Sequence, residues 1–162
     1  CELHPEPLES LETLFRSDKQ VGIHHLDGFT GLKALLPPKE RRGLVLIDPP
    51  YEQEQEIAAI LAGLAEAQSR WETGIYAVWY PITPRAQHER FLKQLKASGI
   101  RRIFRAELDI GSAATGAMTG NGMVVIRPPW QFDSEVEQLL PWLRQTLAGE
   151  DGRADCGWLV GE

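Results

Sequence analysis

Short apolar runs alternate along this chain with longer amphipathic stretches, and this alternation constrains the fold more than any other feature. The run 43–47 (Gly-Leu-Val-Leu-Ile) is continuously apolar, which is typical of a strand buried on both faces of a parallel sheet. The stretch 54–69 instead spaces its apolar residues as one face of a helix. Strands that alternate with helices imply βαβ crossovers, so we expect an α/β protein with a mostly parallel, three-layer sheet.

The same patterns predict the remaining elements. We expect helices over 6–15, 31–36, 54–69, 86–97 and 133–147, and strands over 21–25, 43–47, 74–80, 100–110, 122–127 and 158–160. Asp133 is expected to cap the last helix. A Gly-rich loop over 111–121, with no helix, joins the strands 100–110 and 122–127. These two strands are therefore predicted to pair antiparallel at one edge of the sheet.

The charge is unevenly distributed. The 162 residues fit one domain and carry a net charge of −6, opposite in sign to a purely electrostatic nucleic-acid binder. The segment 85–105 nevertheless has a net charge of +6, which leaves −12 for the rest of the chain. Its basic residues are Arg85, Arg90, Lys93, Lys96, Arg101, Arg102 and Arg105. Such a segment is typical of contact with a phosphate backbone, although a solvated helix face explains it as well.

Other features exclude several classes of protein. The two cysteines, Cys1 and Cys156, form neither a disulfide framework nor a metal cluster, and they suit a reducing, cytoplasmic location. His24 and His25 are adjacent, so on a strand they would face opposite sides and would not share a metal. No apolar run approaches the roughly 20 residues needed to span a bilayer. We expect a monomer without metal or membrane segment.

The strongest chemical signal is the tetrapeptide Asp48-Pro49-Pro50-Tyr51, directly after the apolar run. The two prolines lack backbone donors and fix φ, so the carbonyls of Asp48 and Pro49 are predicted to face the cleft beside the Asp48 carboxylate. Tyr51 adds a flat aromatic face. Two acceptors and a stacking plane suit a planar heterocycle with an exocyclic amine. Accepting both amine hydrogens would localise the nitrogen lone pair for attack on an electrophilic methyl group.

This tetrapeptide belongs to an ordered set of motifs. In chain order they are Glu2-Leu3-His4-Pro5, Asp27-Gly28, Leu46–Glu52, Trp79-Tyr80-Pro81-Ile82, Gly120-Asn121-Gly122-Met123 and Pro128-Pro129-Trp130. The set covers nearly the whole chain and resembles the bacterial 23S ribosomal RNA adenine-N6 methyltransferase J family, which has an older label linked to catabolism of external DNA. The resemblance implies a Rossmann-like methyltransferase sandwich that transfers a methyl group from S-adenosylmethionine to the N6 amine of an adenine in large-subunit ribosomal RNA.

The resemblance also implies a set of cofactor-binding residues. Glu2 matches the acidic residue that accepts hydrogen bonds from the ribose hydroxyls of S-adenosylmethionine. Asp27 and Gly28 match the positions that face the adenine of the cofactor. Asp48 completes this set at the end of its strand. Alone, Glu2 reads equally as a helix N-terminal carboxylate, and Asp27-Gly28 as an ordinary turn.

A second set of residues is implied for the target base. Asp48 and Pro49 match the catalytic acceptors for the target amine, and Tyr51 matches the ring that stacks on the base. Pro50 and Tyr80 are expected to line the substrate-binding site. A paired adenine cannot reach such a pocket, so the ribosomal RNA target is expected to be flipped out or single-stranded.

The chain departs from the family pattern at its start and near its end. It opens on Cys1, and neither a Gly-rich cofactor loop after a first strand nor a helical insertion is visible. We therefore expect residues 1–162 to be the C-terminal part of a single methyltransferase domain, from which these features are absent. Arg127 stands where Asn is expected before Pro128-Pro129, and no catalytic role is assigned to it.

Two alternatives remain open. The motif reads an amine and not a sugar, so a DNA adenine-N6 methyltransferase fits the same residues. A non-catalytic nucleic-acid binding or DNA-utilisation protein could keep the fold without turnover.

Overall fold

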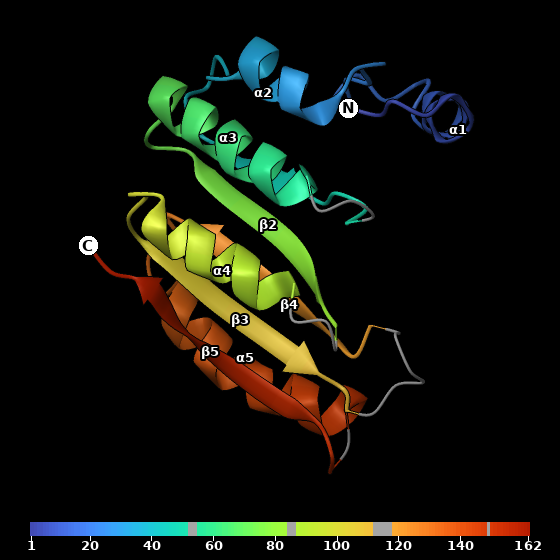
Figure 1. Cartoon of the computed structure of the whole chain (residues 1–162). Coiled ribbons are helices and arrows are strands. Elements are labelled where there is room, and N and C mark those ends of the chain that lie inside the picture. Colours follow the sequence, from blue (N-terminus) through green and yellow to red (C-terminus); the bar gives the residue numbers. More distant parts are fainter. Residues whose placement is uncertain (52–54, 84–86, 112–117, 149) are drawn as a thin grey trace.

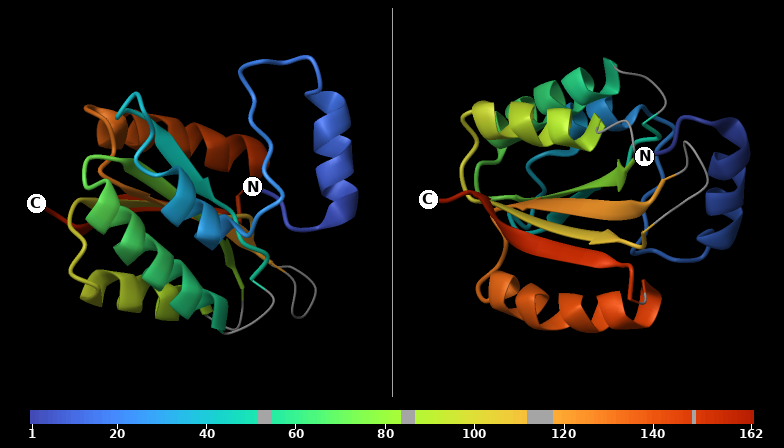
Figure 2. Two further views of the ribbon diagram at one scale, coloured as in Figure 1. Left: turned by 90° about the horizontal axis from the view of Figure 1, so that it is seen from above. Right: turned by 60° about the horizontal axis from the view of Figure 1, so that its bottom comes forward.

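The computed structural model describes residues 1–51, 55–83, 87–111, 118–148 and 150–162, and these form a mixed α/β fold (Figure 1). The helices are α1 (Pro5–Leu14), α2 (Gly28–Leu35), α3 (Gln55–Arg70), α4 (Gln87–Ala97) and α5 (Phe132–Leu147). The strands are β1 (Leu44–Ile47), β2 (Ile75–Ile82), β3 (Ile103–Asp109), β4 (Gly120–Ile126) and β5 (Arg153–Val160). Helices α3 and α4 cover one face of the sheet and α5 covers the other, which makes three layers (Figure 2).

The five-stranded sheet has the order β1-β2-β4-β3-β5. Only β1 and β2 pair in parallel, whereas β2 with β4, β3 with β4, and β3 with β5 are antiparallel. The prediction of a mostly parallel sheet is therefore wrong for the described strands. The predicted antiparallel pairing of β3 with β4 is confirmed, but β4 lies inside the sheet and not at its edge. Helix α4 connects β2 to β3, and these two strands run in the same direction. Strand β4 inserts between them in the opposite direction, so both strands pair antiparallel with β4.

Two glycines make room for β4 in this position. Gly122 pairs with Tyr80 of β2, and a Cβ atom added to Gly122 would lie 2.1 Å from the Tyr80 ring. A Cβ added to Gly120 would lie 2.4 Å from the carbonyl oxygen of Leu108 on β3. The glycines on both sides of Asn121 thus allow β4 to approach both neighbours closely.

The strand expected over 21–25 does not form. In its place, Glu2 and His25 make one isolated parallel bridge, in which the Glu2 amide donates to the His24 carbonyl at 3.1 Å. Only a few residues can pair here, because α1 begins at Pro5. The expected cap of α5 is also wrong: Gln131 is the N-cap, and Asp133 lies in the first turn.

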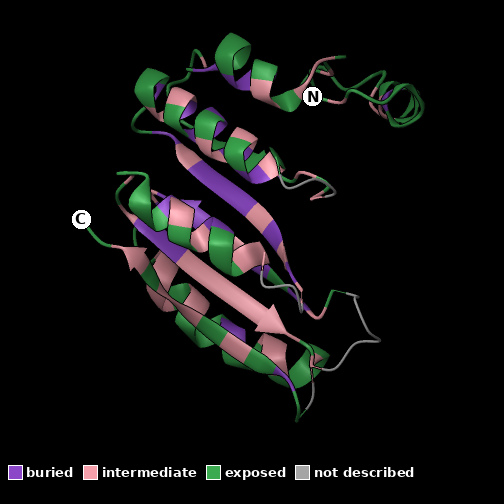
Figure 3. Cartoon of the chain, in the orientation of Figure 1, coloured by how far each residue is buried: buried purple, intermediate pink, exposed green. Residues whose placement is uncertain are grey.

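The main core lies between α3, α4 and the sheet. Side chains at alternate positions of β2, among them Tyr76 and Val78, are completely buried there together with Leu64 of α3 and Phe91 of α4. Figure 3 shows that the buried residues concentrate in the central strands, whereas β5 is partly exposed. None of the described helices has the length and apolarity required to cross a lipid bilayer.

Candidate functional site

A cleft of about 510 Å³ lies beside β1, between the start of α2 and the loop that follows the strand. Asp27 and Gly28 line one side, and Asp48, Pro49 and Pro50 line the other. The fold thus brings together two of the sequence motifs. The cleft runs along β1 from Leu44 to Ile47 and reaches the loop beyond the carboxyl end of the strand. The region beyond the carboxyl ends of strands is where ligands bind in open α/β sheets.

Apolar residues that the sequence analysis did not single out form much of the cleft wall. They include Phe29 and Leu32 of α2, Val45 and Ile47 of β1, and Cys1. Phe29 and Leu32 are spaced by one helical turn, which predicts from the sequence that they share a face of the helix. What this face lines depends on where α2 packs in the fold.

Asp27 has a structural task in addition to facing the cleft. It is the N-cap of α2, and its Oδ2 atom accepts from the Thr30 amide at 2.8 Å and from the Thr30 hydroxyl at 3.0 Å. These hydrogen bonds hold the carboxylate at the wall of the cleft. At the neighbouring Gly28, an added Cβ would meet no heavy atom within 4 Å, so this position borders open space.

Glu2 lies beside the cleft but is not among the residues that line it. Its Oε1 atom accepts from the His4 amide at 2.7 Å, at the start of α1. This hydrogen bond lowers the pKa of the Glu2 carboxyl below its ordinary value. The Glu2 carbonyl also accepts from the Leu26 amide at 3.2 Å, which places the Glu2 backbone next to the segment that carries Asp27.

Tyr51 is held in an unusual backbone conformation. Its φ is 56°, in the left-handed region that is strained for a residue of this size. Its hydroxyl donates to the Trp79 carbonyl at 2.7 Å, and its half-buried ring lies edge-on to the Trp79 ring, with a centroid distance of 5.8 Å. Burial, and then the Asp48 carboxylate, raise the pKa of the Tyr51 hydroxyl, which therefore stays a donor at neutral pH.

Trp79 is the supporting residue that sequence reasoning missed. Its indole Nε1 donates to the Asn121 side-chain oxygen at 3.0 Å, so β4 fixes Trp79 and Trp79 in turn fixes Tyr51. The signal was the alternation along β2, in which Trp79 lies on the less buried face and Tyr80 on the fully buried one.

Tyr80 is completely buried, and together with Tyr51 it lines a small pocket beside α4. Its expected place at the substrate entrance stays a prediction. Its hydroxyl donates to Glu107 at 2.7 Å, and burial raises its pKa. Arg105 bridges Glu107 and Asp155, which ties β3 to β5. Tyr80 therefore connects β2 to this network beneath the loop that carries Tyr51.

The basic residues of segment 85–105 separate into two groups. Arg90, Lys93, Lys96 and Arg101 are exposed, whereas Arg102 is paired with Glu162 and Arg105 is held by two carboxylates. Arg85, Glu52 and residues 112–117 of the expected Gly-rich loop lie outside the described residues. Among the residues that are described, no group of three or more side chains is arranged to hold a metal ion.

Comparisons with known proteins agree with the motifs that meet in this cleft. Residues 1–160 match the family described as "Ribosomal RNA large subunit methyltransferase D, RlmJ". Two proteins called "Ribosomal RNA large subunit methyltransferase J", from Escherichia coli and Haemophilus influenzae, are each 43% identical over 99% of this chain. The chain spans 58% of each of these relatives.

A solved structure gives the same result for the fold. The crystal structure of a Legionella pneumophila protein matches 98% of this chain and 59% of its own, with a TM-score of 0.88 and 36% identity. The match extends over both sides of the cleft, and it agrees with the family match over residues 1–160. The chain therefore belongs to the large-subunit ribosomal RNA methyltransferase J family.

Proposed function

We propose that this chain carries the target-amine site and part of the cofactor site of an enzyme that methylates the N6 amine of an adenine in large-subunit ribosomal RNA. The observation that carries the proposal is the cleft in which Asp27 and Gly28 face Asp48, Pro49 and Pro50. Family membership supports the reaction class.

The residues present fit S-adenosylmethionine as the methyl donor. Asp27 and Asp48 offer acceptors to amine and hydroxyl groups, and Phe29 and Leu32 offer an apolar wall to a planar base. Glu2 would reach the ribose with Oε2, because its Oε1 atom holds the His4 amide. Bound S-adenosylmethionine would supply an electrophilic methyl group.

At the other end of the cleft, Asp48 and the Pro49 carbonyl would accept the two hydrogens of the target amine. These hydrogen bonds would draw the nitrogen lone pair out of the purine ring and direct it at the methyl carbon. Pro50 would border the base, and the accessible part of the Tyr51 ring would stack on it. The bond from Tyr51 to Trp79 supports this role, because a stacking surface acts best when its orientation is fixed beforehand.

The test replaces Asp48 in the full-length protein. Asp48→Ala removes the side-chain acceptor, and we expect a loss of kcat of at least about 100-fold, as for loss of a charge-stabilising group. Cofactor affinity should fall much less, because Glu2 and Asp27 stay in place. Asp48→Asn keeps one carbonyl acceptor and should retain more activity than Asp48→Ala. Methyl transfer from labelled cofactor and calorimetric cofactor binding measure the two effects. Activity of Asp48→Ala within tenfold of the parent would contradict the acceptor role.

The same assay distinguishes the alternatives. Naked ribosomal RNA and DNA are offered to the parent protein in separate reactions, and the product nucleoside is identified by mass spectrometry. Label in N6-methyladenosine from the RNA supports the proposal. Label in DNA alone would support a DNA methyltransferase, and no label in either would support a non-catalytic binding protein.

A further inference from the structure

The outer face of α4 carries a line of positive charge. Arg90, Lys93 and Lys96 recur every three residues along the helix, and Arg101 follows just after its end. All four are exposed, and together they are called the basic ridge below. The opposite face of α4 packs Phe91 and Leu95, both fully buried, against the sheet. This packing fixes the direction in which the basic ridge points.

Lys93, Lys96 and Arg101 of the basic ridge differ from arginines of the same region that are paired with acids. Arg127 donates to Glu72 at 2.7 Å, and Arg105 is held by Glu107 and Asp155. Within the described part of the chain, Lys93, Lys96 and Arg101 have no carboxylate in ion-pair contact. Glu89 is the single acid within α4. The basic ridge therefore keeps a net positive charge on a chain whose remainder is strongly acidic.

Helix α3, beside the basic ridge, exposes several small side chains together with the ion pair of Glu66 and Arg70. Helix α3 runs next to α4 on the same face of the sheet (Figure 1). The exposed positions of α3 include Ala58, Ala62, Ala65 and Ser69. Small side chains at these positions allow a bulky polyanion to approach the ends of the lysine and arginine side chains without steric hindrance.

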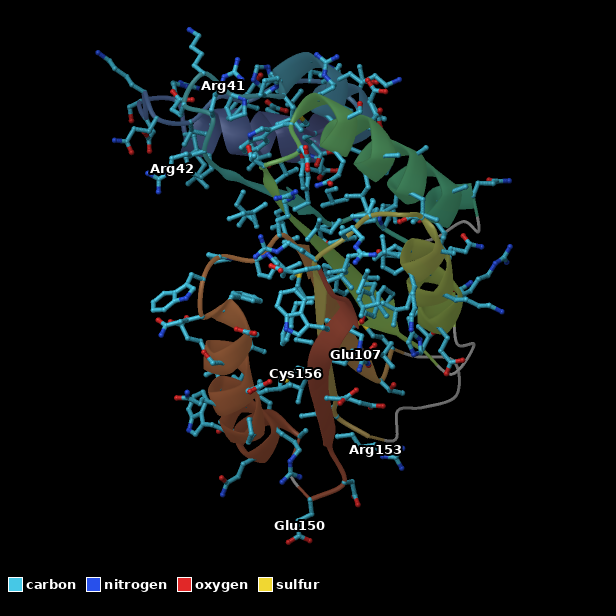
Figure 4. The ribbon with its side chains drawn as sticks, turned by 90° about the vertical axis from the view of Figure 1, so that its left-hand side faces the viewer. Arg41, Arg42, Glu107, Glu150, Arg153 and Cys156 are labelled. Carbon is cyan, nitrogen blue, oxygen red and sulfur yellow. The ribbon has the colours of Figure 1, made fainter. Side chains whose placement is uncertain are left out.

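The basic ridge also begins at the proper place for a nucleic acid that enters the candidate site. Arg90 lines a small pocket together with Tyr51 and Tyr80, so the first residue of the ridge lies close to the loop that follows Asp48. From Arg90 to Lys96 the ridge extends over roughly 9 Å of helix axis. A second basic cluster, which includes Arg41 and Arg42, lies on the other side of the molecule from α4 (Figure 4).

We propose that the basic ridge binds the phosphate backbone of the RNA at nucleotides away from the target adenine. The inference rests on the proposed function for the identity of the polyanion. Phosphate contacts of this kind position a nucleic acid and contribute affinity that depends on salt, and they leave the chemical step unaffected.

The experiment uses the full-length protein with Lys93→Gln, Lys96→Gln and Arg101→Gln combined, and circular dichroism checks the fold. The probe is a fluorescent, naked ribosomal RNA fragment, whose anisotropy is measured at several salt concentrations. We expect the Kd at low salt to rise about tenfold or more. The logarithm of the association constant decreases with the logarithm of the salt concentration. In the variant this dependence should become less steep by about 0.7 for each phosphate that is no longer neutralised. The KM for RNA should rise, with kcat at saturating RNA unchanged.

A matched triple variant at the second cluster is the control: Lys39→Gln, Arg41→Gln and Arg42→Gln. An equal loss of affinity in this control would mean that binding follows total charge and not the basic ridge. A parental Kd and salt slope in the ridge variant would overturn the inference, as would a lower kcat with unchanged Kd. RNA binding is measured without methyl transfer, so the two proposals can fail separately. A parent protein that binds RNA through the basic ridge but transfers no methyl group to it would refute the proposed function and leave the inference about the ridge standing.

Discussion

At Asp27 and Gly28, local structure and the candidate cofactor site coincide. The Asp27 carboxylate caps α2 through Thr30 and at the same time lines the cleft. Gly28 follows as the first residue of α2, with open space where a side chain would be. Its φ lies outside the left-handed region, so the backbone itself does not require glycine here. Gly28 therefore matters to the candidate site because it leaves the cleft open, and not because the backbone requires a glycine.

Gly28→Leu tests this role directly. The Cβ of the new side chain would meet no heavy atom within 4 Å, and the rest would extend from an open position into the cleft, so stability should change by no more than about 0.5 kcal/mol while the cleft is partly filled. We expect S-adenosylmethionine binding to weaken by about tenfold or more, as measured by calorimetry on the full-length protein. Gly161→Leu is the control, because that position is equally open but lies outside the cleft. Unchanged cofactor binding in Gly28→Leu would remove Gly28 from the site.

Among the elements, α1 is preceded by a local hydrogen bond to a single carboxylate. The His4 amide donates to Glu2, and Pro5 and Pro7 need no acceptor for an amide of their own. In Figure 2, α1 stands beyond the ends toward which β2 and β3 point, apart from the three layers. The hydrogen bond from His4 to Glu2 therefore orders the turn that leads into α1.

The lowered pKa of Glu2 gives this bond a pH dependence with a definite sign. A folded-state pKa below the ordinary value of 4.5 means that the stabilisation is complete above 4.5 and is lost as the pH falls through the lowered value. The His4 amide resonance should titrate with a midpoint below 4.5, measured by NMR. Glu2→Gln should abolish the titration. A midpoint at or above 4.5 would contradict the hydrogen bond.

The whole molecule has a second packed layer, on the α5 side of the sheet. Phe104 of β3 is 1% exposed and lies edge-on to Phe132 of α5 and Trp158 of β5, at centroid distances of 5.9 and 5.5 Å. This aromatic group joins α5 to the sheet through residues far apart in the sequence. Its integrity should therefore decide whether α5 stays attached.

Phe104→Ala is expected to reduce the free energy of unfolding by about 3–5 kcal/mol, because it removes a buried aromatic ring and leaves a cavity. Denaturant unfolding of the full-length protein measures this change. Trp130→Ala is the control, since Trp130 is 86% exposed, and its effect should stay within about 0.5 kcal/mol. A loss below about 1 kcal/mol in Phe104→Ala would show that α5 is held by other contacts.

Local patterns of residues are enough to predict the elements with strong periodicity and the motif that ends β1. Helices α3 and α4 and strand β1 lie where apolar spacing placed them, because period and burial are local properties of the chain. The role of Asp48 followed from its neighbours in the sequence, and it stays a prediction that the cleft supports.

The strand order and the partners of the aromatic residues depend on packing between distant parts of the chain. Local patterns do not encode which strands lie side by side, so the insertion of β4 between β2 and β3 depended on the close approach that Gly120 and Gly122 permit. The same insertion brings Asn121 to Trp79, and the bond between them fixes the support of Tyr51. Contacts between residues this distant arise from packing, which is why they became visible only in three dimensions.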